Sequence, residues 1–203
     1  MKIAIAGASG RAGSRITAEL AGRGHSVTAI ARNPDRIAKL ANVTAVAGDA
    51  NDRAALAGLW AGHDAAVSSI HFTASNAETL IGAARDAGVP RYLVVGGAGS
   101  LEVSPGVRLV TTPSFPAQYK AEAESGAAFL DRLQQEKELN WTFLSPSALF
   151  DSGNRTGKFR LGGDQLLVDQ AGKSWISFED FAVAMADEIE RPAHIRKRFT
   201  VGY

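Results

Sequence analysis

The chain has 203 residues, of which 45% are hydrophobic and 21% charged, with a formal net charge of +1 and no cysteine. This size and composition predict one globular domain, 1–203, with a core of its own. The small net charge argues against a nucleic-acid or anionic-membrane partner, and the lack of cysteine excludes disulfides, thiol catalysis and cysteine-bound metals. No run approaches the ~20 apolar residues of a membrane helix, and the apolar N-terminus is too short for a secretion signal, so we expect a cytoplasmic protein without a metal site.

Short apolar runs alternate with longer amphipathic runs over the first 95 residues. The apolar runs predict strands at Lys2–Ala6, Ser26–Ala31, Val43–Ala47, 65–70 and 91–95. The amphipathic runs predict helices at Arg11–Gly22, 34–40, 53–60 and Ala77–Ala87, with Pro34 in a first turn and Asp52 as a cap. This alternation predicts an α/β fold, a Rossmann-type doubly wound parallel sheet with helices on both faces.

The second half of the chain is less regular. Residues 100–116 contain three prolines and no strong periodicity, which predicts a functional or mobile loop. A long helix is expected over 117–138, followed by a strand over 141–144. The last fifty residues mix glycine turns with one helix, opened by Ser177 as N-cap and Asp180 in its first turn. We expect 151–203 to form a small lobe packed on the substrate side of the sheet.

A glycine-rich turn lies between the first strand and the first helix. Gly7, Gly10 and Gly13 give the spacing G-x-x-G-x-x-G. Glycine permits the sharp turn and close approach of backbone to a pyrophosphate, and the helix N-terminus offers N–H groups and partial positive charge. In this strand–turn–helix context the motif predicts a dinucleotide site that includes Ser9, Arg11 and Ala12, rather than an unliganded turn.

The ends of the second and third strands bear on which nucleotide binds. An acidic residue after the second strand would favour NAD, whereas Arg32 there, with Arg11 in the glycine loop, favours the 2′-phosphate of NADP(H). The alternative for either arginine is a solvated surface residue. Asp49, followed by Ala50, either accepts a hydrogen bond from the adenine amino group or serves as an ordinary turn residue.

Several further residues follow strands at the edge where ligands bind in open α/β sheets. We assign Ser69, Ile70, His71, Gly97 and, from the resemblance below, Pro146 to the cofactor site. His71 reaches a phosphate, ribose or substrate, or else caps a surface turn. A candidate apolar wall for a planar substrate comprises Phe72, Phe115 and Phe150, of which at least one is expected in the core.

Seven segments of the chain resemble a known superfamily. KIAIAGASGRAGSRI, ARNPDR, GDANDRAAL, GHDAAVSSI, YKAEAESGAAFL, NWTFLSPSALF and WISFEDFAVAMADEIERP are similar to the atypical short-chain dehydrogenase/reductases. Within that superfamily they resemble bacterial NAD(P)H-binding proteins of the NADH-flavin reductase-like and biliverdin/flavin reductase-like group. The similarity covers essentially the whole chain and implies the fold and cofactor more strongly than a reaction.

The chain departs from typical superfamily members in its catalytic residues. They use a Tyr-x-x-x-Lys pair, whereas Tyr119 is followed at that spacing by Ala123. Lys120, the next residue, points about 100° away around the helix. Ser100 follows the glycines after the fifth strand, where such enzymes often carry serine, and SPSALF lacks the histidine of flavin reductase-like relatives. Tyr119 and Ser100 are the candidate catalytic residues, although a tyrosine at a helix start also commonly packs over a sheet edge.

Three functions remain open from the sequence. The first is hydride transfer from NADPH to a flavin, quinone or similar planar acceptor, which needs little acid catalysis because the acceptor is an electron sink. The second is a redox sensor that binds NADP(H) without turnover, resembling NmrA. The third is an NAD(P)-dependent epimerase or isomerase, against which the missing Tyr-x-x-x-Lys counts. The sequence carries no signal for an oligomeric state.

Overall fold

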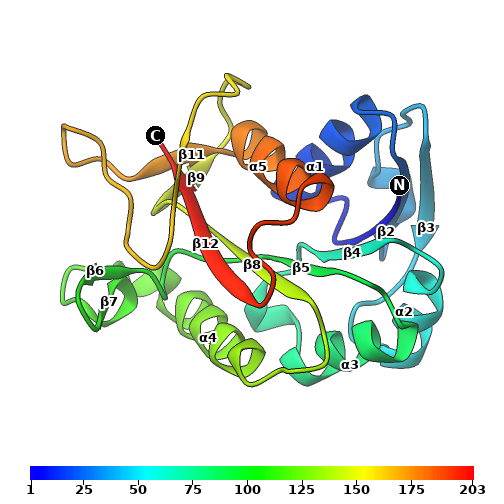
Figure 1. The fold of residues 1–203 in the computed structure, drawn as a ribbon, viewed down its shortest axis with the longest axis horizontal. Coiled ribbons are helices and arrows are strands. Elements are labelled where there is room, and N and C mark those ends of the chain that lie inside the picture. The colour runs from blue at the N-terminus through cyan, green and yellow to red at the C-terminus, as the bar shows by residue number, and fades with distance from the viewer.

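The computed structural model describes residues 1–203, which are built around one eight-stranded sheet (Figure 1). Its strands lie in the order β10 (Arg160–Gly162), β12 (Lys197–Gly202), β8 (Trp141–Pro146), β5 (Tyr92–Val95), β4 (Ala65–Ser68), β1 (Lys2–Ala6), β2 (Ser26–Ala31) and β3 (Val43–Ala47). All neighbours are parallel except β10 and β12. The chain winds outward from β1 in both directions, so the predicted Rossmann-type sheet is confirmed.

Helices cover both faces of the sheet. In Figure 1, α1 (Arg11–Gly22) and α5 (Phe178–Glu190) lie above it, and α2 (Arg53–Trp60), α3 (Ala77–Ala87) and α4 (Ala117–Gln134) lie below. Successive side chains of a strand point to opposite faces. Accordingly Ile3 and Ile5 join the apolar cluster between the sheet and the helices α1 and α5. Ala4 and Ala6 join the cluster between the sheet and the other three helices.

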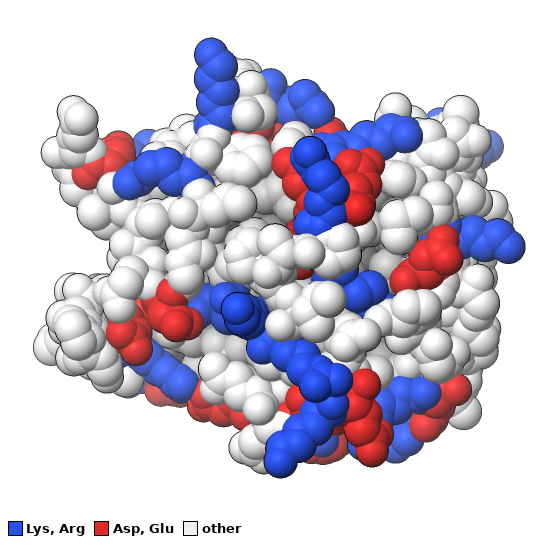
Figure 2. Space-filling model, viewed as in Figure 1, with Lys and Arg blue, Asp and Glu red and all other residues white.

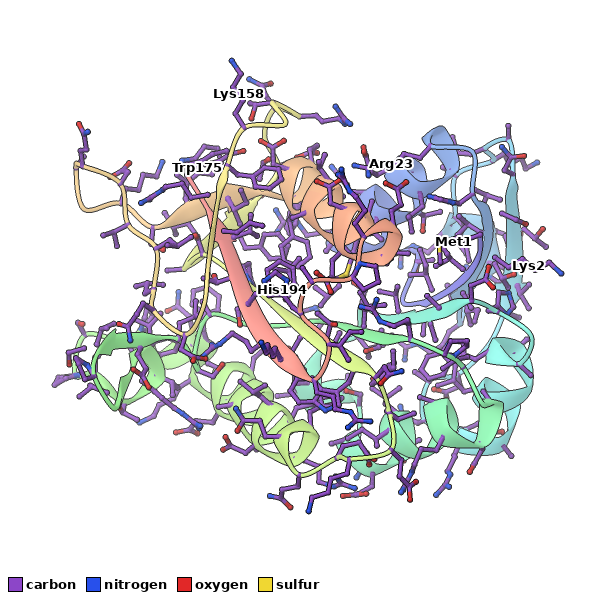
Figure 3. The ribbon with its side chains drawn as sticks, viewed as in Figure 1. Met1, Lys2, Arg23, Lys158, Trp175 and His194 are labelled. Carbon is purple, nitrogen blue, oxygen red and sulfur yellow. The ribbon has the colours of Figure 1, made fainter.

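The two helices of the upper face are also joined by ion pairs. Arg23, at the end of α1, places Nη1 2.7 Å from Asp187 and 2.8 Å from Glu190 of α5 (Figure 3). On the face drawn in Figure 2, basic and acidic side chains are interspersed, as expected for a chain of net charge +1. None of the helices is both long and apolar enough to cross a membrane.

Several expected elements differ in type or length from the structure. The helix expected over 34–40 is a single 3-10 turn, η1 (Pro34–Arg36), because only Ile37 of that stretch is buried and a longer helix would have no face to pack. The long helix α4 ends at Gln134 instead of residue 138, and β4 ends at Ser68 instead of residue 70. The expected loop over 100–116 contains a hairpin, β6 (Glu102–Ser104) with β7 (Val107–Arg108), and the turn η3 (Leu109–Thr111).

The segment 151–203, expected as a lobe packed on the sheet, is in large part built into it. β12 lies between β8 and β10, and α5 covers the same face as α1. The small parallel pair β9 (Leu149–Asp151) and β11 (Trp175–Ser177) lies outside the main sheet. Five of the six residues of β12 pair with β8, a strand more than fifty residues earlier in the chain, and such a distant pairing has no local sequence signal.

Both helix caps expected from the sequence are present. Asp52 accepts a hydrogen bond from the Ala55 N–H at 3.0 Å, and Ser177 accepts one from the Asp180 N–H at 3.0 Å. The Asp180 carboxylate itself is buried, and it accepts from Thr156 and from the hydroxyl of Tyr203 at 2.7 Å. Asp180 therefore anchors the start of α5 to two distant parts of the chain.

Candidate active site

The glycine loop fits only residues without a side chain at two of its positions. Gly7 has φ +82°, and a Cβ on it would lie 2.1 Å from the carbonyl oxygen of Ser69. A Cβ on Gly13 would lie 2.2 Å from the carbonyl oxygen of Gly7. The N–H groups of Gly7 and Ala8 both donate to the carbonyl of Ile30, at 3.0 and 3.1 Å. The loop is thus packed tightly between the ends of β2 and β4.

The N-terminus of α1 is open to an anion. Its N-cap is Gly10, in extended backbone, and no side chain caps it. The first turn also lacks an acidic residue. The first-turn N–H groups therefore have no side-chain acceptor, and no acidic residue of the turn itself offsets the partial positive charge of the helix end. A cradle that a Cβ would fill, together with an uncapped helix, fits the pyrophosphate of a dinucleotide cofactor.

A cavity of about 550 Å³ lies beside this helix end, at the carboxyl edge of the sheet. Half of its 26 lining residues are hydrophobic. Nine residues assigned from the sequence line it: Gly10, Arg11, Ala12, Ser69, Ile70, His71, Gly97, Tyr119 and Pro146. Segments that follow β1, β4, β5 and β8 are thereby brought together in one place, as parallel topology requires.

The remaining assigned residues lie elsewhere. Gly7, Ser9 and Gly13 belong to the glycine loop but are not in the cavity wall, and Arg32, Asp49 and Ala50 follow β2 and β3, beyond it. Arg32 is exposed and makes no hydrogen bond or ion pair within the chain. The Asp49 carboxylate accepts from the N–H of Asn51 at 2.9 Å, so it serves the turn.

Arg11 is engaged within the protein. Its guanidinium is ion-paired with the carboxylate of Asp151 on β9 and lies 4.7 Å from the centre of the Phe178 ring. Asp151 and Phe178 are both distant in sequence from the glycine loop, and no local pattern pointed to either. Because Arg11 lines the cavity and Arg32 does not, the two arginines do not form one phosphate site.

The two residues predicted to be catalytic have opposite surroundings. Tyr119, in the first turn of α4, is 61% exposed and lines the cavity, and its hydroxyl bonds to no other residue. Ser100 is only 3% exposed, its hydroxyl has no partner, and it is absent from the cavity wall. Ser100 therefore lies outside the cavity wall, and its catalytic role stays a prediction.

Glu122, which sequence reasoning missed, is the most constrained polar side chain of the cavity. One carboxylate oxygen accepts from the N–H of Phe72 at 2.7 Å, and the other accepts from the N–H and hydroxyl of Thr73 at 3.0 and 2.7 Å. Partial burial works to raise the pKa of Glu122, but these hydrogen bonds outweigh it and lower that pKa. Its carboxylate clamps η2 (Phe72–Ala74) to α4, a long-range contact without a sequence signal.

The aromatic side chains expected in an apolar wall are present in the cavity. Phe72, Phe115 and Phe150 all line it, together with Phe178. Phe72 is stacked on Phe143 at 6.1 Å between ring centres, and a Cβ on Gly126 would lie 2.8 Å from the Phe72 ring. Phe150 also packs 4.4 Å from Phe178, so it serves the core as well as the wall.

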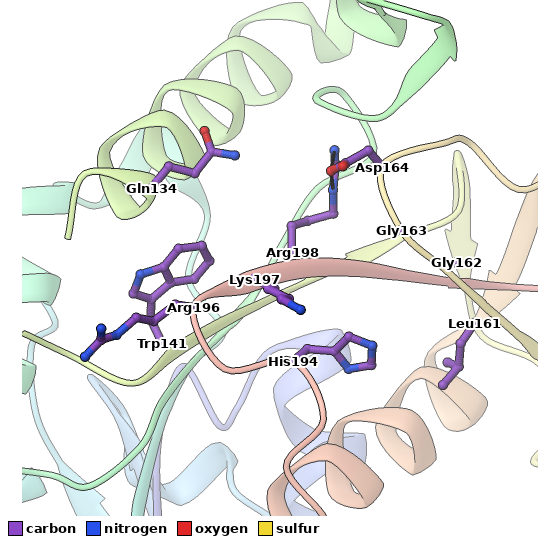
Figure 4. Close-up of a pocket in the computed structure, with 10 residues that line it drawn as sticks. All are labelled: Gln134, Trp141, Leu161, Gly162, Gly163, Asp164, His194, Arg196, Lys197 and Arg198. Carbon is purple, nitrogen blue, oxygen red and sulfur yellow. Dashed lines mark hydrogen bonds and ion pairs between the residues drawn. The ribbon is translucent and has the colours of Figure 1, made fainter. Parts of the chain in front are cut away.

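A second cavity, of about 490 Å³, lies at the opposite edge of the sheet, where β12 begins (Figure 4). It contains three consecutive basic residues, Arg196, Lys197 and Arg198. Their side chains point apart: Arg198 extends to Asp164, Lys197 extends from the other side of β12, and Arg196 lies beside Trp141 (Figure 4). Diverging cations do not converge on one ligand, and this cavity is not a candidate active site.

Comparison with known proteins agrees with this geometry. A family model described as NAD(P)H-binding matches residues 7–192. Among solved structures, a "putative exported protein" from Burkholderia pseudomallei is 47% identical, with TM-score 0.91 and full coverage of both chains. A "putative epimerase" from Bacteroides thetaiotaomicron is 39% identical, with TM-score 0.95, covering 100% of this chain and 96% of the other. A "putative NADH-flavin reductase" from Streptococcus pneumoniae is 34% identical, with TM-score 0.86, covering 100% and 99%.

Proposed function

The chain belongs to the NAD(P)H-binding family, and on this basis we propose that it is an NADPH-dependent reductase of flavins, quinones or similar planar acceptors. The membership in an NAD(P)H-binding family, expected from the sequence, is confirmed. The similarity to the "putative NADH-flavin reductase" of Streptococcus pneumoniae supports the reaction class. We place this activity in the cytoplasm, as expected from the sequence, although the Burkholderia relative is named an exported protein.

The cofactor assignment rests on the glycine loop and on Arg32. The uncapped N-terminus of α1 would bind the pyrophosphate. The adenosine half of the cofactor would then lie towards the end of β2, and the nicotinamide half towards β8. Arg32, exposed and free of acidic partners, is available for a 2′-phosphate. No carboxylate occupies its position after β2, so the chain lacks the usual acceptor for the ribose hydroxyls of NAD.

The observation that carries the acceptor proposal is the aromatic cavity beside the glycine loop. Its volume of about 550 Å³ lies within the range of small-molecule sites, about 300–1,000 Å³. Phe72, Phe115, Phe150 and Phe178 supply apolar surface suited to a flat conjugated ring. When bound, the nicotinamide would supply the hydride, and these side chains would orient the acceptor and exclude water.

The test is steady-state oxidation of NADPH by the purified protein, with FMN, FAD and 1,4-naphthoquinone as acceptors and NADH as the comparison cofactor. We expect turnover well above the rate without protein, with NADPH preferred. Protein that binds NADPH, as shown by its fluorescence, but turns over none of these acceptors would contradict the reductase. That outcome would favour a cofactor-binding sensor.

A further inference from the structure

The cavity wall contains only four ionisable side chains: Arg11, His71, Tyr119 and Glu122. Arg11 keeps its charge at any physiological pH and is paired with Asp151. The lowered pKa of Glu122 keeps it ionised near neutral pH, so it has no proton to give. The Tyr119 hydroxyl has no partner to orient it, and the nearby Lys120 is directed to Glu124 at 3.9 Å.

His71 differs from the other three because it can carry a proton and is held by a partner. Its Nδ1 lies 3.3 Å from the Oε1 atom of Glu122. A carboxylate only accepts hydrogen bonds, so Nδ1 must be the donor, and Nε2 is left for a ligand. The His71 side chain is 85% exposed at the rim of the cavity, where water can return a proton after each cycle.

The position of Glu122 is fixed independently of His71. The N–H groups of Phe72 and Thr73 and the Thr73 hydroxyl hold both of its oxygens. His71 is the N-cap of the same turn, η2. The hydrogen bonds that fix this turn therefore also fix the backbone from which the imidazole projects. The charged side chains that line the cavity with His71 are Glu122 from α4, which contacts it, and Arg11 from α1, whose charge is offset by Asp151.

We propose that His71 is the proton donor for the reduced acceptor, and that Glu122 is the residue that positions it. This inference rests on the proposed reductase function. It replaces the tyrosine–lysine pair, which the chain lacks, with an imidazole–carboxylate pair formed where η2 meets α4.

The step balances in atoms and electrons. A quinone acceptor gains one hydride, with its two electrons, from the reduced nicotinamide, which is thereby oxidised. The Nε2–H bond of the His71 imidazolium breaks, and its proton forms an O–H bond with the quinone oxygen that became anionic. His71 is left neutral with Nδ1 still donating to Glu122, and solvent restores the lost proton.

The first experiment compares H71Q with wild type in NADPH oxidation by 1,4-naphthoquinone from pH 5.5 to 8.5. In wild type we expect kcat to fall as pH rises, because the donor must be protonated. H71Q should lower kcat by about 10²-fold and remove both the pH dependence and the solvent deuterium isotope effect. H63Q is the control imidazole, since His63 contacts Thr28 and Trp60 away from the cavity.

The second experiment reads the pair without turnover, by ¹⁵N NMR of the His71 ring at fixed pH in wild type, E122Q and E124Q. Glu124 lies on the same helix, but it faces Lys120 rather than the cavity. Loss of the Glu122 charge weakens the hydrogen bond from Nδ1, so the Nδ1 signal should move in E122Q and stay at the wild-type position in E124Q. E122Q should also lower kcat more than it changes the KM for the quinone, which a purely structural role would not do.

The outcomes separate this inference from the proposed function. Wild-type turnover with an unchanged rate and pH profile in H71Q would overturn the proton donor and leave the reductase standing. Equal Nδ1 signals in wild type and E122Q would overturn the positioning role of Glu122. Wild-type protein that binds NADPH but reduces no acceptor would overturn the reductase, and the transfer step with it, whatever the NMR signals show.

Discussion

Arg11, the first residue of α1, is ion-paired with Asp151 at the end of β9. The pair joins the glycine loop to the far side of the cavity, and it places a carboxylate next to the helix end that would receive a pyrophosphate. Like charges repel, so Asp151 weakens the field that attracts the phosphates.

We therefore expect D151N to bind NADP⁺ more tightly, by about 3- to 10-fold at low ionic strength, with the gain shrinking as salt screens the charge. Fluorescence titration at two salt concentrations measures this. D86N is the matched control, because Asp86 on α3 also forms an exposed ion pair with an arginine, Arg53 on α2. Weaker binding in D151N would show instead that the pair holds Arg11 in the geometry that the cofactor needs.

R32A should separate the two nicotinamide cofactors. A charge-assisted hydrogen bond contributes about 1.5–3 kcal/mol, so we expect the Kd for NADPH to rise by about 10- to 100-fold and that for NADH to change little. R36A removes an exposed arginine four residues further on and should change neither value. Equal losses for NADPH and NADH in R32A would remove the case for a 2′-phosphate site.

G7A should damage the fold and the site together. The new Cβ would lie 2.1 Å from the Ser69 carbonyl oxygen, at a positive φ. Ser69 directly follows β4, so its carbonyl oxygen cannot move away without disturbing that strand. We therefore expect a loss of several kcal/mol in unfolding free energy. G22A is the control: its Cβ meets nothing within 4 Å at the end of α1, and stability should stay equal or rise slightly. Urea unfolding compares the two.

A buried ion pair at the other end of the sheet predicts a second large stability effect. Arg91 and Glu188 are 3.1 Å apart with side chains 9% and 3% exposed, and Glu188 also accepts from His194 at 2.8 Å. E188Q leaves the Arg91 charge buried without its partner, which should cost about 3–5 kcal/mol. E190Q, on the same helix but near the surface, should cost less than about 1 kcal/mol. Similar losses in both variants would contradict this difference.

The stability contributed by Glu122 should depend on pH. Its pKa is lowered in the folded protein, so its contribution is fully present above the pKa of an unfolded glutamate, about 4.3, and is lost as pH falls through the lowered folded value. E122Q should therefore be less stable than wild type at pH 7, and the difference should shrink at pH 3. A constant difference across this range would show that the charge of Glu122 contributes nothing.

Local patterns accounted for much of the fold. The alternation of strands and helices, the caps at Asp52 and Ser177, and the glycine loop all depend on neighbours within a few residues, and all three appear in the structure. The helix expected after Pro34 is only one turn in the structure. Whether a turn continues into a helix depends on burial, which a local pattern does not determine.

The parts of the site that sequence reasoning missed depend on long-range contacts. In the sequence, Glu122 is one of several charged residues on a helix. Its role becomes visible only when η2 lies against α4 and the Phe72 N–H donates to its carboxylate. Asp151 and Phe178 likewise meet Arg11 only after β9 and α5 have been placed around α1. Ser100 was expected at the reaction because it follows β5, yet the turn buries it.

β12 lies between β8 and β10, although both precede it in the chain. During synthesis β10 leaves the ribosome before the strand with which it pairs, and the edge of β8 stays without its neighbour for the fifty residues that separate it from β12. The nascent chain therefore carries one unpaired strand, β10, and one open edge, that of β8, and both are sites of misassociation. Chaperone dependence during translation should accordingly peak after β8 is made and end when β12 is released.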